Sequence, residues 1–77
     1  MEKIKLEIIS PEGIVISCDC MFISLPSTEG IIEIRFGHEP IVIQLREGNI
    51  QYDSAEPMHI HAGFATVTGS LCKILLI

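Results

Sequence analysis

The chain has little positive charge and few aromatic side chains: five lysines and arginines, no tryptophan and one tyrosine in 77 residues. A net charge of −5 argues against a nucleic-acid ligand, because phosphates demand clustered cations. An aromatic content of 5% is too low for a base-stacking surface. No apolar run approaches the ~20 residues of a membrane helix, and no signal peptide precedes the first strand pattern. These absences favour a cytosolic protein that reaches a membrane only through a protein partner.

Cysteine is also scarce. The chain has three cysteines, Cys18, Cys20 and Cys72. An odd number without the spacing of a disulfide framework predicts free thiols. Cys18 and Cys20, like His59 and His61, are two residues apart and share a side of a strand, so a Cys-Cys-His-His zinc site is conceivable. Alternation, however, places the histidines outward and Cys18 on an apolar face. The pattern favours solvated histidines and core thiols, and we expect no metal and no cofactor.

Apolar residues, by contrast, are plentiful. They make up 48% of the chain, with a mean hydropathy of +0.48. Residues 1–77 form one small domain, and a chain of this size buries only ~60% of its unfolded surface. The excess of apolar residues predicts an exposed patch for a partner, rather than isoleucines scattered over the surface of a monomer.

Alternation of apolar and polar residues predicts strands throughout. Ile4, Leu6 and Ile8 alternate with charged residues, and similar short runs follow with turn residues between them. No window shows a period of 3.6 residues. We therefore predict an all-β fold, a two-sheet β-sandwich of about ten short strands. Glu47-Gly48-Asn49 is predicted to close a short hairpin.

Catalytic groups are not evident. A nucleophile needs a base and an orienting group that converge in a cleft, and a sandwich of this size leaves little room for one. Glu29, Glu33 and Glu39 lie beside turns or on outward faces, where solvation is the default. The glycines are isolated, and none opens a helix as in a phosphate-binding loop. We predict that the chain is not an enzyme.

The most informative stretch is residues 25–40, LPSTEGIIEIRFGHEP. It places a turn at residues 26–30 and another at residues 37–40 on either side of one apolar strand. Such a unit could present both loops on one edge of a sheet. That arrangement suits a binding partner better than a catalytic centre.

This stretch resembles the N-terminal domain of the epsilon subunit of F-type ATP synthases, which corresponds to the mitochondrial delta subunit. The matching elements run through nearly the whole chain: Leu25-Pro26, Glu29-Gly30, Ile34, Gly37-His38-x-Pro40, Glu47-Gly48-Asn49-Ile50, Ala62-Gly63-Phe64 and Val67. Two residues depart from the family pattern. Phe36 stands where the family usually has proline, and Glu47 stands where it usually has proline or aspartate. We expect a fold without the C-terminal helical hairpin of most bacterial members.

The resemblance implies a non-catalytic rotor subunit that joins the gamma subunit to the membrane c-ring and so couples proton flow to ATP synthesis. It would bind no nucleotide and lie peripherally on the cytoplasmic side of the bacterial inner membrane. In the family, the Glu-Gly and Gly-His-x-Pro turns contact the ring, and an apolar face contacts gamma. Carried over, the expected c-ring contacts are Ser27, Thr28, Glu29, Gly30, Ile31, His38 and Glu39. The expected gamma contacts are Ile41, Val42, Ile43, Asn49 and Phe64.

Val42 is the informative residue among these contacts, because it lies on the opposite side of its strand from Ile41 and Ile43. One side can serve the core and the other a partner, whereas the alternative is a strand buried on both sides.

Two other functions stay open on the sequence. One is a free-standing β-sandwich that binds a protein or ligand outside any rotary machine, and the other is a Cys-Cys-His-His zinc module.

Overall fold

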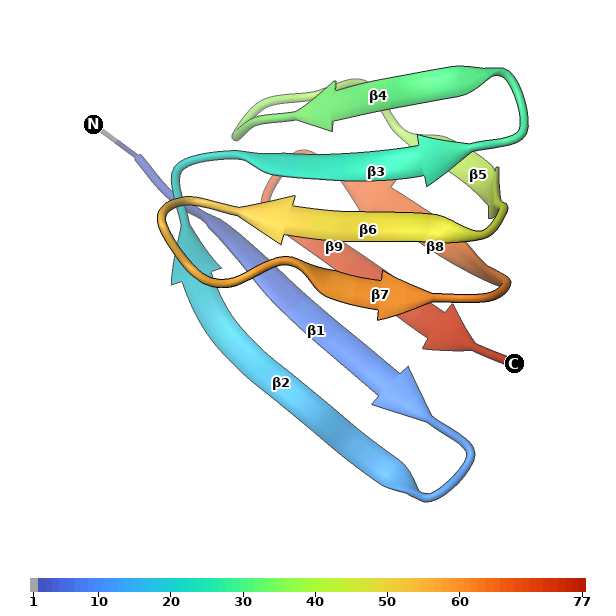
Figure 1. Ribbon diagram of the computed structural model, residues 1–77. Coiled ribbons are helices and arrows are strands. Elements are labelled where there is room, and N and C mark those ends of the chain that lie inside the picture. Colours follow the sequence, from blue (N-terminus) through green and yellow to red (C-terminus); the bar gives the residue numbers. More distant parts are fainter. Residues whose placement is uncertain (1) are drawn as a thin grey trace.

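The strands of this protein are short and follow one another with few intervening residues (Figure 1). The computed structural model describes residues 2–77, except for the side chain of Ile14, and the domain predicted over residues 1–77 therefore includes one residue, Met1, outside the described part. The strands are β1 (Ile4–Ser10), β2 (Gly13–Cys20), β3 (Ile23–Ser27), β4 (Gly30–Ile34), β5 (Ile41–Leu45), β6 (Gly48–Tyr52), β7 (Met58–Ile60), β8 (Gly63–Thr68) and β9 (Leu71–Leu76). The all-β prediction is confirmed, with nine strands among the described residues in place of about ten. Within residues 2–77, no helix is long and apolar enough to cross a membrane.

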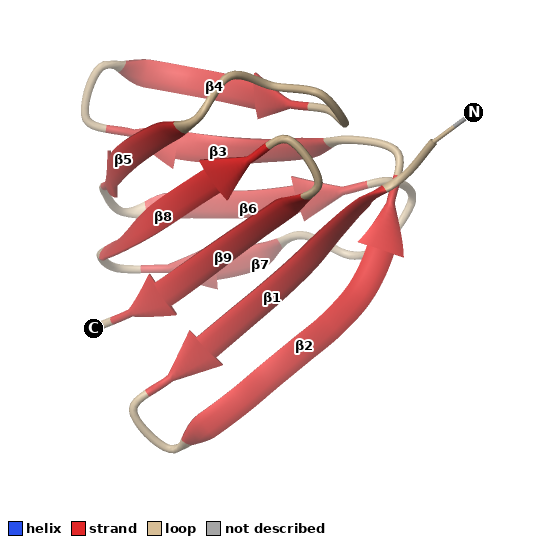
Figure 2. Cartoon of the chain, turned by 180° about the vertical axis from the view of Figure 1, so that it is seen from behind, coloured by secondary structure: helices blue, strands red, loops and turns tan. Residues whose placement is uncertain are grey.

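The strands form two layers (Figures 1 and 2). One layer has the order β2-β1-β9-β8-β5, and the other has the order β4-β3-β6-β7. Neighbouring strands are antiparallel except for β1 and β9, which pair in parallel near the two ends of the chain. Two sheets packed face to face are the predicted sandwich.

The two layers are joined at one corner, where Ser27 of β3 pairs with Leu45 of β5. Both β5 and β6 run antiparallel to β3, so residues 41–52 form one bent strand that passes from the first layer to the second. The backbone N–H of Arg46 donates to the carbonyl of Pro26 at 2.9 Å and holds this bend against β3. The chain therefore does not reverse here.

The hairpin predicted at Glu47-Gly48-Asn49 is consequently wrong. Gly48 is required for a different reason, because a Cβ at this position would lie 2.7 Å from the Cβ of Pro26. A glycine allows the bent strand to approach β3 closely. Gly48, whose place in the sequence indicates a turn, instead allows the close approach of two strands.

Side chains from every second position of the strands fill the space between the layers. The core consists of fully or almost fully buried apolar residues: Ile4, Leu6, Ile8, Cys20, Ile23, Leu25, Ile34, Ile43, Leu45, Ile50, Ile60, Ala65, Val67, Cys72 and Ile74. Branched side chains dominate this list, and they pack well on pleated surfaces. The alternate positions face outward and form the surfaces considered next.

Two tight turns of the same design close the β1–β2 and β3–β4 hairpins. In residues 10–13 and in residues 27–30, a serine hydroxyl donates to the carbonyl of the glycine three residues on and accepts the N–H of the glutamate two residues on. The glycines have φ values of +135° and +119°, which L side chains rarely adopt. Both turns therefore have fixed shapes.

Candidate interaction surfaces

The β3–β4 turn presents part of the predicted ring-contact set to solvent. Thr28 and Glu29 are exposed, and Ile31 is 74% exposed, which is unusual for an isoleucine. Ser27 is buried and shapes the turn through the hydrogen bonds described above. The guanidinium of Arg46 donates from Nε to the carbonyl of Ser27 at 3.0 Å, so a cation lies beside the turn. Polar and apolar contacts are both available at this end of the sandwich.

His38 and Glu39 lie elsewhere. They belong to the loop that leaves β4 at Ile34, the end opposite Gly30, and β4 is five residues long. The two loops therefore start ~13 Å apart along the strand. The N–H of Gly37 donates to the carbonyl of Gly69 at 2.7 Å, which ties this loop to the β8–β9 turn. The structure does not bring His38 and Glu39 together with residues 27–31.

An apolar patch covers the outer side of three strands in the first layer. Val42 is 72% exposed, Phe64 45% and Leu75 47%. In the sheet register Gln44, Phe64 and Leu75 form one row across β5, β8 and β9, and Val42 is diagonal to Phe64. Half-buried Ile9 continues the row onto β1. We call Val42, Phe64 and Leu75 the outer apolar patch.

The predicted gamma-contact residues divide between this patch and other places. Val42 and Phe64 belong to the patch, and the exposure of Val42 excludes a strand buried on both sides. Ile43 is only 3% exposed and faces the core, while Ile41 lies on the same side of β5 and is 37% exposed where the strand begins. Asn49 is exposed in the other layer. Leu75 was not predicted, because its neighbours across the sheet follow only from the register.

An open hollow of about 260 Å³ separates the β3–β4 turn from β5. It lies where β4 forms the edge of one layer and β5 the edge of the other. Its lining combines members of both predicted contact sets with two further residues: Ser27, Thr28, Glu29, Ile32, Ile41, Val42, Ile43 and Gln44. The two predicted contact regions are therefore adjacent at this corner.

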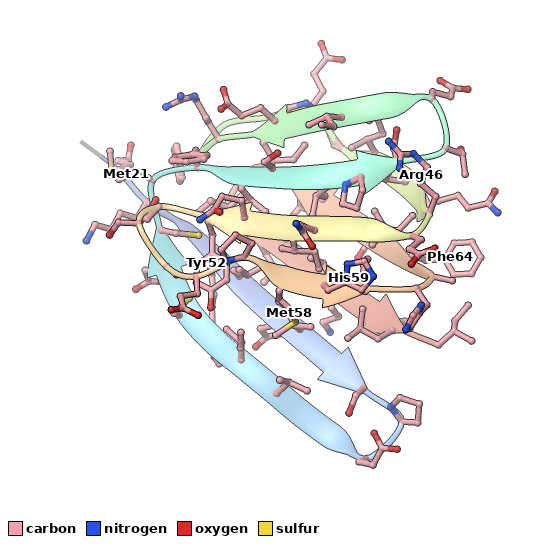
Figure 3. The ribbon with its side chains drawn as sticks, viewed as in Figure 1. Met21, Arg46, Tyr52, Met58, His59 and Phe64 are labelled. Atoms are coloured by element: carbon pink, nitrogen blue, oxygen red, sulfur yellow. The ribbon has the colours of Figure 1, made fainter. Side chains whose placement is uncertain are left out.

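The cysteines and histidines lie apart. Burial raises the pKa of Cys20 and of Cys72 to about 12, so both thiols are protonated at neutral pH. His59 is exposed on β7 (Figure 3), and His61 is exposed directly after this strand. The recorded side-chain contacts of both histidines are with Glu47. Among the described residues, the one cluster of three potential metal ligands is Glu47, His59 and His61. The Cys-Cys-His-His arrangement considered from the sequence is not formed.

Comparison with known proteins decides the family. Residues 3–76 match the family model described as the ATP synthase delta/epsilon chain beta-sandwich domain. The chain belongs to this family. The ATP synthase epsilon chain of Endomicrobium trichonymphae is 33% identical over 78 residues, which are 97% of this chain and 56% of the relative. The epsilon chain of Rhodospirillum centenum is 28% identical over 80 residues, 96% of this chain and 55% of the relative.

Solved structures share the fold of this chain. A chain of the central stalk and c-ring structure of the Tetrahymena thermophila mitochondrial ATP synthase superposes with a TM-score of 0.83 at 14% identity, over 99% of this chain and 64% of that one. A chain of the Euglena gracilis mitochondrial ATP synthase gives 0.82 at 23% identity, over 99% and 51%. The chain spans rather more than half the length of the curated relatives it matches. The family predicted from residues 25–40 is confirmed.

Proposed function

We propose that this delta/epsilon β-sandwich is a non-catalytic rotor subunit of an F-type ATP synthase. It would hold the gamma subunit to the membrane c-ring, so that a ring turned by proton flow turns gamma with it. The observation that supports this proposal most directly is the match to the family over residues 3–76, together with relatives named ATP synthase epsilon chain. On this proposal the subunit lies peripherally on the cytoplasmic side of a bacterial inner membrane.

The outer apolar patch is the proposed contact with gamma. Val42, Phe64 and Leu75 supply the apolar area, and Gln44, Thr66 and Lys73 lie beside them in the same two rows of the sheet. A mixture of exposed apolar and polar side chains on one face is the usual composition of a specific interface. Ile43 would support β5 from the core side, and Ile41 would extend the contact at the start of the strand.

Asn49 fits this contact less directly. It lies in the β4-β3-β6-β7 layer, whereas the patch lies on the other layer. A contact with Asn49 as well as Val42 would require gamma to reach around an edge of the sandwich. We therefore base the gamma proposal on the patch and treat Asn49 as a separate contact.

The β3–β4 turn is the proposed contact with the c-ring. Thr28, Glu29 and Ile31 are exposed at its tip, and Ser27 and Gly30 fix its shape. A turn of fixed shape loses little conformational entropy when it binds. His38 and Glu39, on the loop tied to Gly69, would need a second contact with the ring or with another subunit.

The test of the gamma proposal is Val42→Asp in a co-purification experiment with the gamma subunit of the same organism. A buried carboxylate without a partner is costly at an interface, so we expect at least a tenfold loss of binding. Val15→Asp is the matched control, because Val15 is 50% exposed on β2, at the opposite edge of the same layer. Circular dichroism and urea unfolding should show both variants folded.

If Val42→Asp binds gamma as tightly as the unsubstituted chain, the outer apolar patch is not part of the interface. If the unsubstituted chain also fails to bind gamma, the rotor proposal itself is wrong. The alternative would then be the free-standing β-sandwich that binds a protein or ligand.

A further inference from the structure

One cluster of ligand-type side chains includes no residue of the outer apolar patch or of the β3–β4 turn. His59 lies on the edge strand β7 (Figure 3), and His61 follows directly after that strand. Glu47 lies in the bend between β5 and β6, and both histidines approach its carboxylate. Asn49 pairs directly with His59 across the β6–β7 ladder, and Glu47 and His61 would face each other if this register continued one residue beyond the last pair, Gly48 and Ile60. The four residues therefore lie close together.

The distances within the cluster are short. Nε2 of His59 is 3.1 Å from Oε2 of Glu47, and Nδ1 of His61 is 3.9 Å from the same oxygen. The rings of His59 and His61 meet edge to face, with their centroids 5.4 Å apart. One ligand atom from each of the three residues lies within 4.8 Å of the others. A single ion could be reached by all three.

Asn49 determines which nitrogen of His59 is available to an ion. The side-chain Oδ1 of Asn49 is 3.1 Å from Nδ1 of His59, and an amide oxygen can only accept, so Nδ1 carries the hydrogen and donates. Nε2 of the neutral ring then turns its lone pair toward the carboxylate oxygen of Glu47. Two electron-rich atoms at this separation are stabilised by a cation that both can contact. That cation can be a proton on Nε2 or a metal ion.

We propose that Glu47, His59 and His61 form a surface site for a divalent transition-metal cation of the Zn²⁺ type. Imidazole nitrogens and a carboxylate oxygen are typical zinc ligands, at about 2.0–2.2 Å from the metal. Ligand atoms of a tetrahedral site with such bonds lie roughly 3–4 Å apart, and both separations from Glu47 fall in this range. Asn49 orients His59 from the outer shell, as hydrogen-bond acceptors do for metal-binding histidines. Three protein ligands leave a fourth position for water or for a side chain of a partner.

A metal ion at this site would stabilise the edge strand β7. Strand β7 pairs with β6 alone and is three residues long. Glu47 and His59 are twelve residues apart in the sequence, so the unfolded chain does not hold them together. An ion bound by all three residues would join β7 to the β5–β6 bend and would stabilise the folded state selectively.

The experiment is a calorimetric titration of the full 77-residue chain with ZnCl₂ in a buffer that does not chelate, together with thermal unfolding. We expect one ion per chain, a Tm that rises with zinc, and at least tenfold weaker binding for each of His59→Asn, His61→Asn and Glu47→Gln. His38→Asn is the matched control, because it removes the remaining histidine of the chain. It should bind zinc as tightly as the unsubstituted chain.

A second measurement separates this site from the thiols. Co²⁺ bound to nitrogen and oxygen ligands lacks the charge-transfer absorption of a thiolate complex, so its spectrum should lack that band and should not change in Cys18→Ala. The proposal is overturned if millimolar zinc produces neither heat nor a Tm shift. It is equally overturned if the three variants, shown to be folded by circular dichroism, bind as well as the control, or if binding requires Cys18.

Discussion

Asp53 holds the connection through which the chain first passes from one layer to the other. Its Oδ1 accepts the N–H of Met21 at 2.8 Å and of Phe22 at 3.2 Å, and these residues link β2 to β3. Its own φ is +47°, a conformation that aspartate and asparagine tolerate better than most residues. We expect Asp53→Ala to lower the free energy of unfolding by about 2–3 kcal/mol in urea denaturation.

The variant Asp53→Asn tests whether the loss in Asp53→Ala comes from the missing acceptor oxygen and the positive φ rather than from the missing negative charge. Asp53→Asn retains an acceptor oxygen and tolerates the positive φ, so its loss should be about 1 kcal/mol. Glu56→Ala lies in the same loop, is exposed and should stay within about 0.5 kcal/mol of the unsubstituted chain. Equal stability of Asp53→Ala and Glu56→Ala would show that the carboxylate does not hold the β2–β3 connection.

Gly63 shows a steric requirement that is independent of φ. A Cβ at this position would lie 2.5 Å from the carbonyl oxygen of Leu75 in β9. Gly63→Ala should therefore push β8 from β9 and destabilise the protein by about 1–3 kcal/mol. Gly69→Ala is the control, because nothing lies within 4 Å of its added Cβ. Chemical denaturation of both variants measures the difference, and an equal effect would contradict the predicted clash.

The sequence predicts which side of its strand a residue faces, but it does not predict which residues of the adjacent strands lie beside it. Alternation predicted correctly that Val42 faces away from Ile43. It could not predict that Phe64 and Leu75 share a row, because that depends on the β8–β9 register. The contact of His59 with Glu47 was missed for the same reason, since it requires both the β6–β7 register and the bend at Glu47.

At the scale of elements, the two serine turns allow an internal comparison. Ser27 is 2% exposed, whereas the turn of Ser10 is exposed, and each hydroxyl makes the same pair of hydrogen bonds. Loss of a hydrogen bond that water cannot replace costs more. We expect Ser27→Ala to cost about 1–3 kcal/mol and Ser10→Ala less than about 1 kcal/mol, as measured by urea unfolding. Equal costs would mean that burial does not matter at this turn.

The elements that sequence reasoning placed well are those set by local pattern. Strands follow from alternation, and the turn predicted at residues 26–30, which contains the serine turn of residues 27–30, follows from proline and glycine beside small polar residues. The β5–β6 bend was misread as a hairpin because Gly48 has the same signature whether it reverses the chain or lies against Pro26. The parallel β1–β9 pair joins opposite ends of the chain, and no local pattern specifies it.

At the scale of the whole molecule, the described chain passes between the layers four times, at the β2–β3, β4–β5, β5–β6 and β7–β8 connections. Asp53 holds the first of these connections, and the β5–β6 bend lies against β3. This bend also places the β3–β4 turn beside β5, with the open hollow between them. The proposed ring and gamma contacts are thus adjacent because of this bend, and a rigid core could transmit torque between them.

The stability of the whole molecule should fall in alkaline solution because of its core thiols. Burial raises the pKa of Cys20 and Cys72 from 9.0 to about 12. The folded state therefore holds these protons more tightly than the unfolded state. Their contribution is complete below pH 9.0, the value for the unfolded chain, and is lost as the pH rises toward about 12. Each thiol should reduce the free energy of unfolding by up to about 1.4 kcal/mol per pH unit in that window.

Urea unfolding at pH 8 and pH 10 measures this loss. The double variant Cys20→Ala/Cys72→Ala should be less stable at pH 8, because it leaves cavities in the core, but its stability should fall less steeply with pH. The pKa values of Cys18 and Tyr52 are also raised by burial, and both residues remain in the double variant. Burial is the largest cause of both shifts and Cys20 a smaller one, so the difference in slope belongs mainly to the two core thiols. Parallel slopes would show that these thiols do not titrate between the folded and unfolded states as their burial requires.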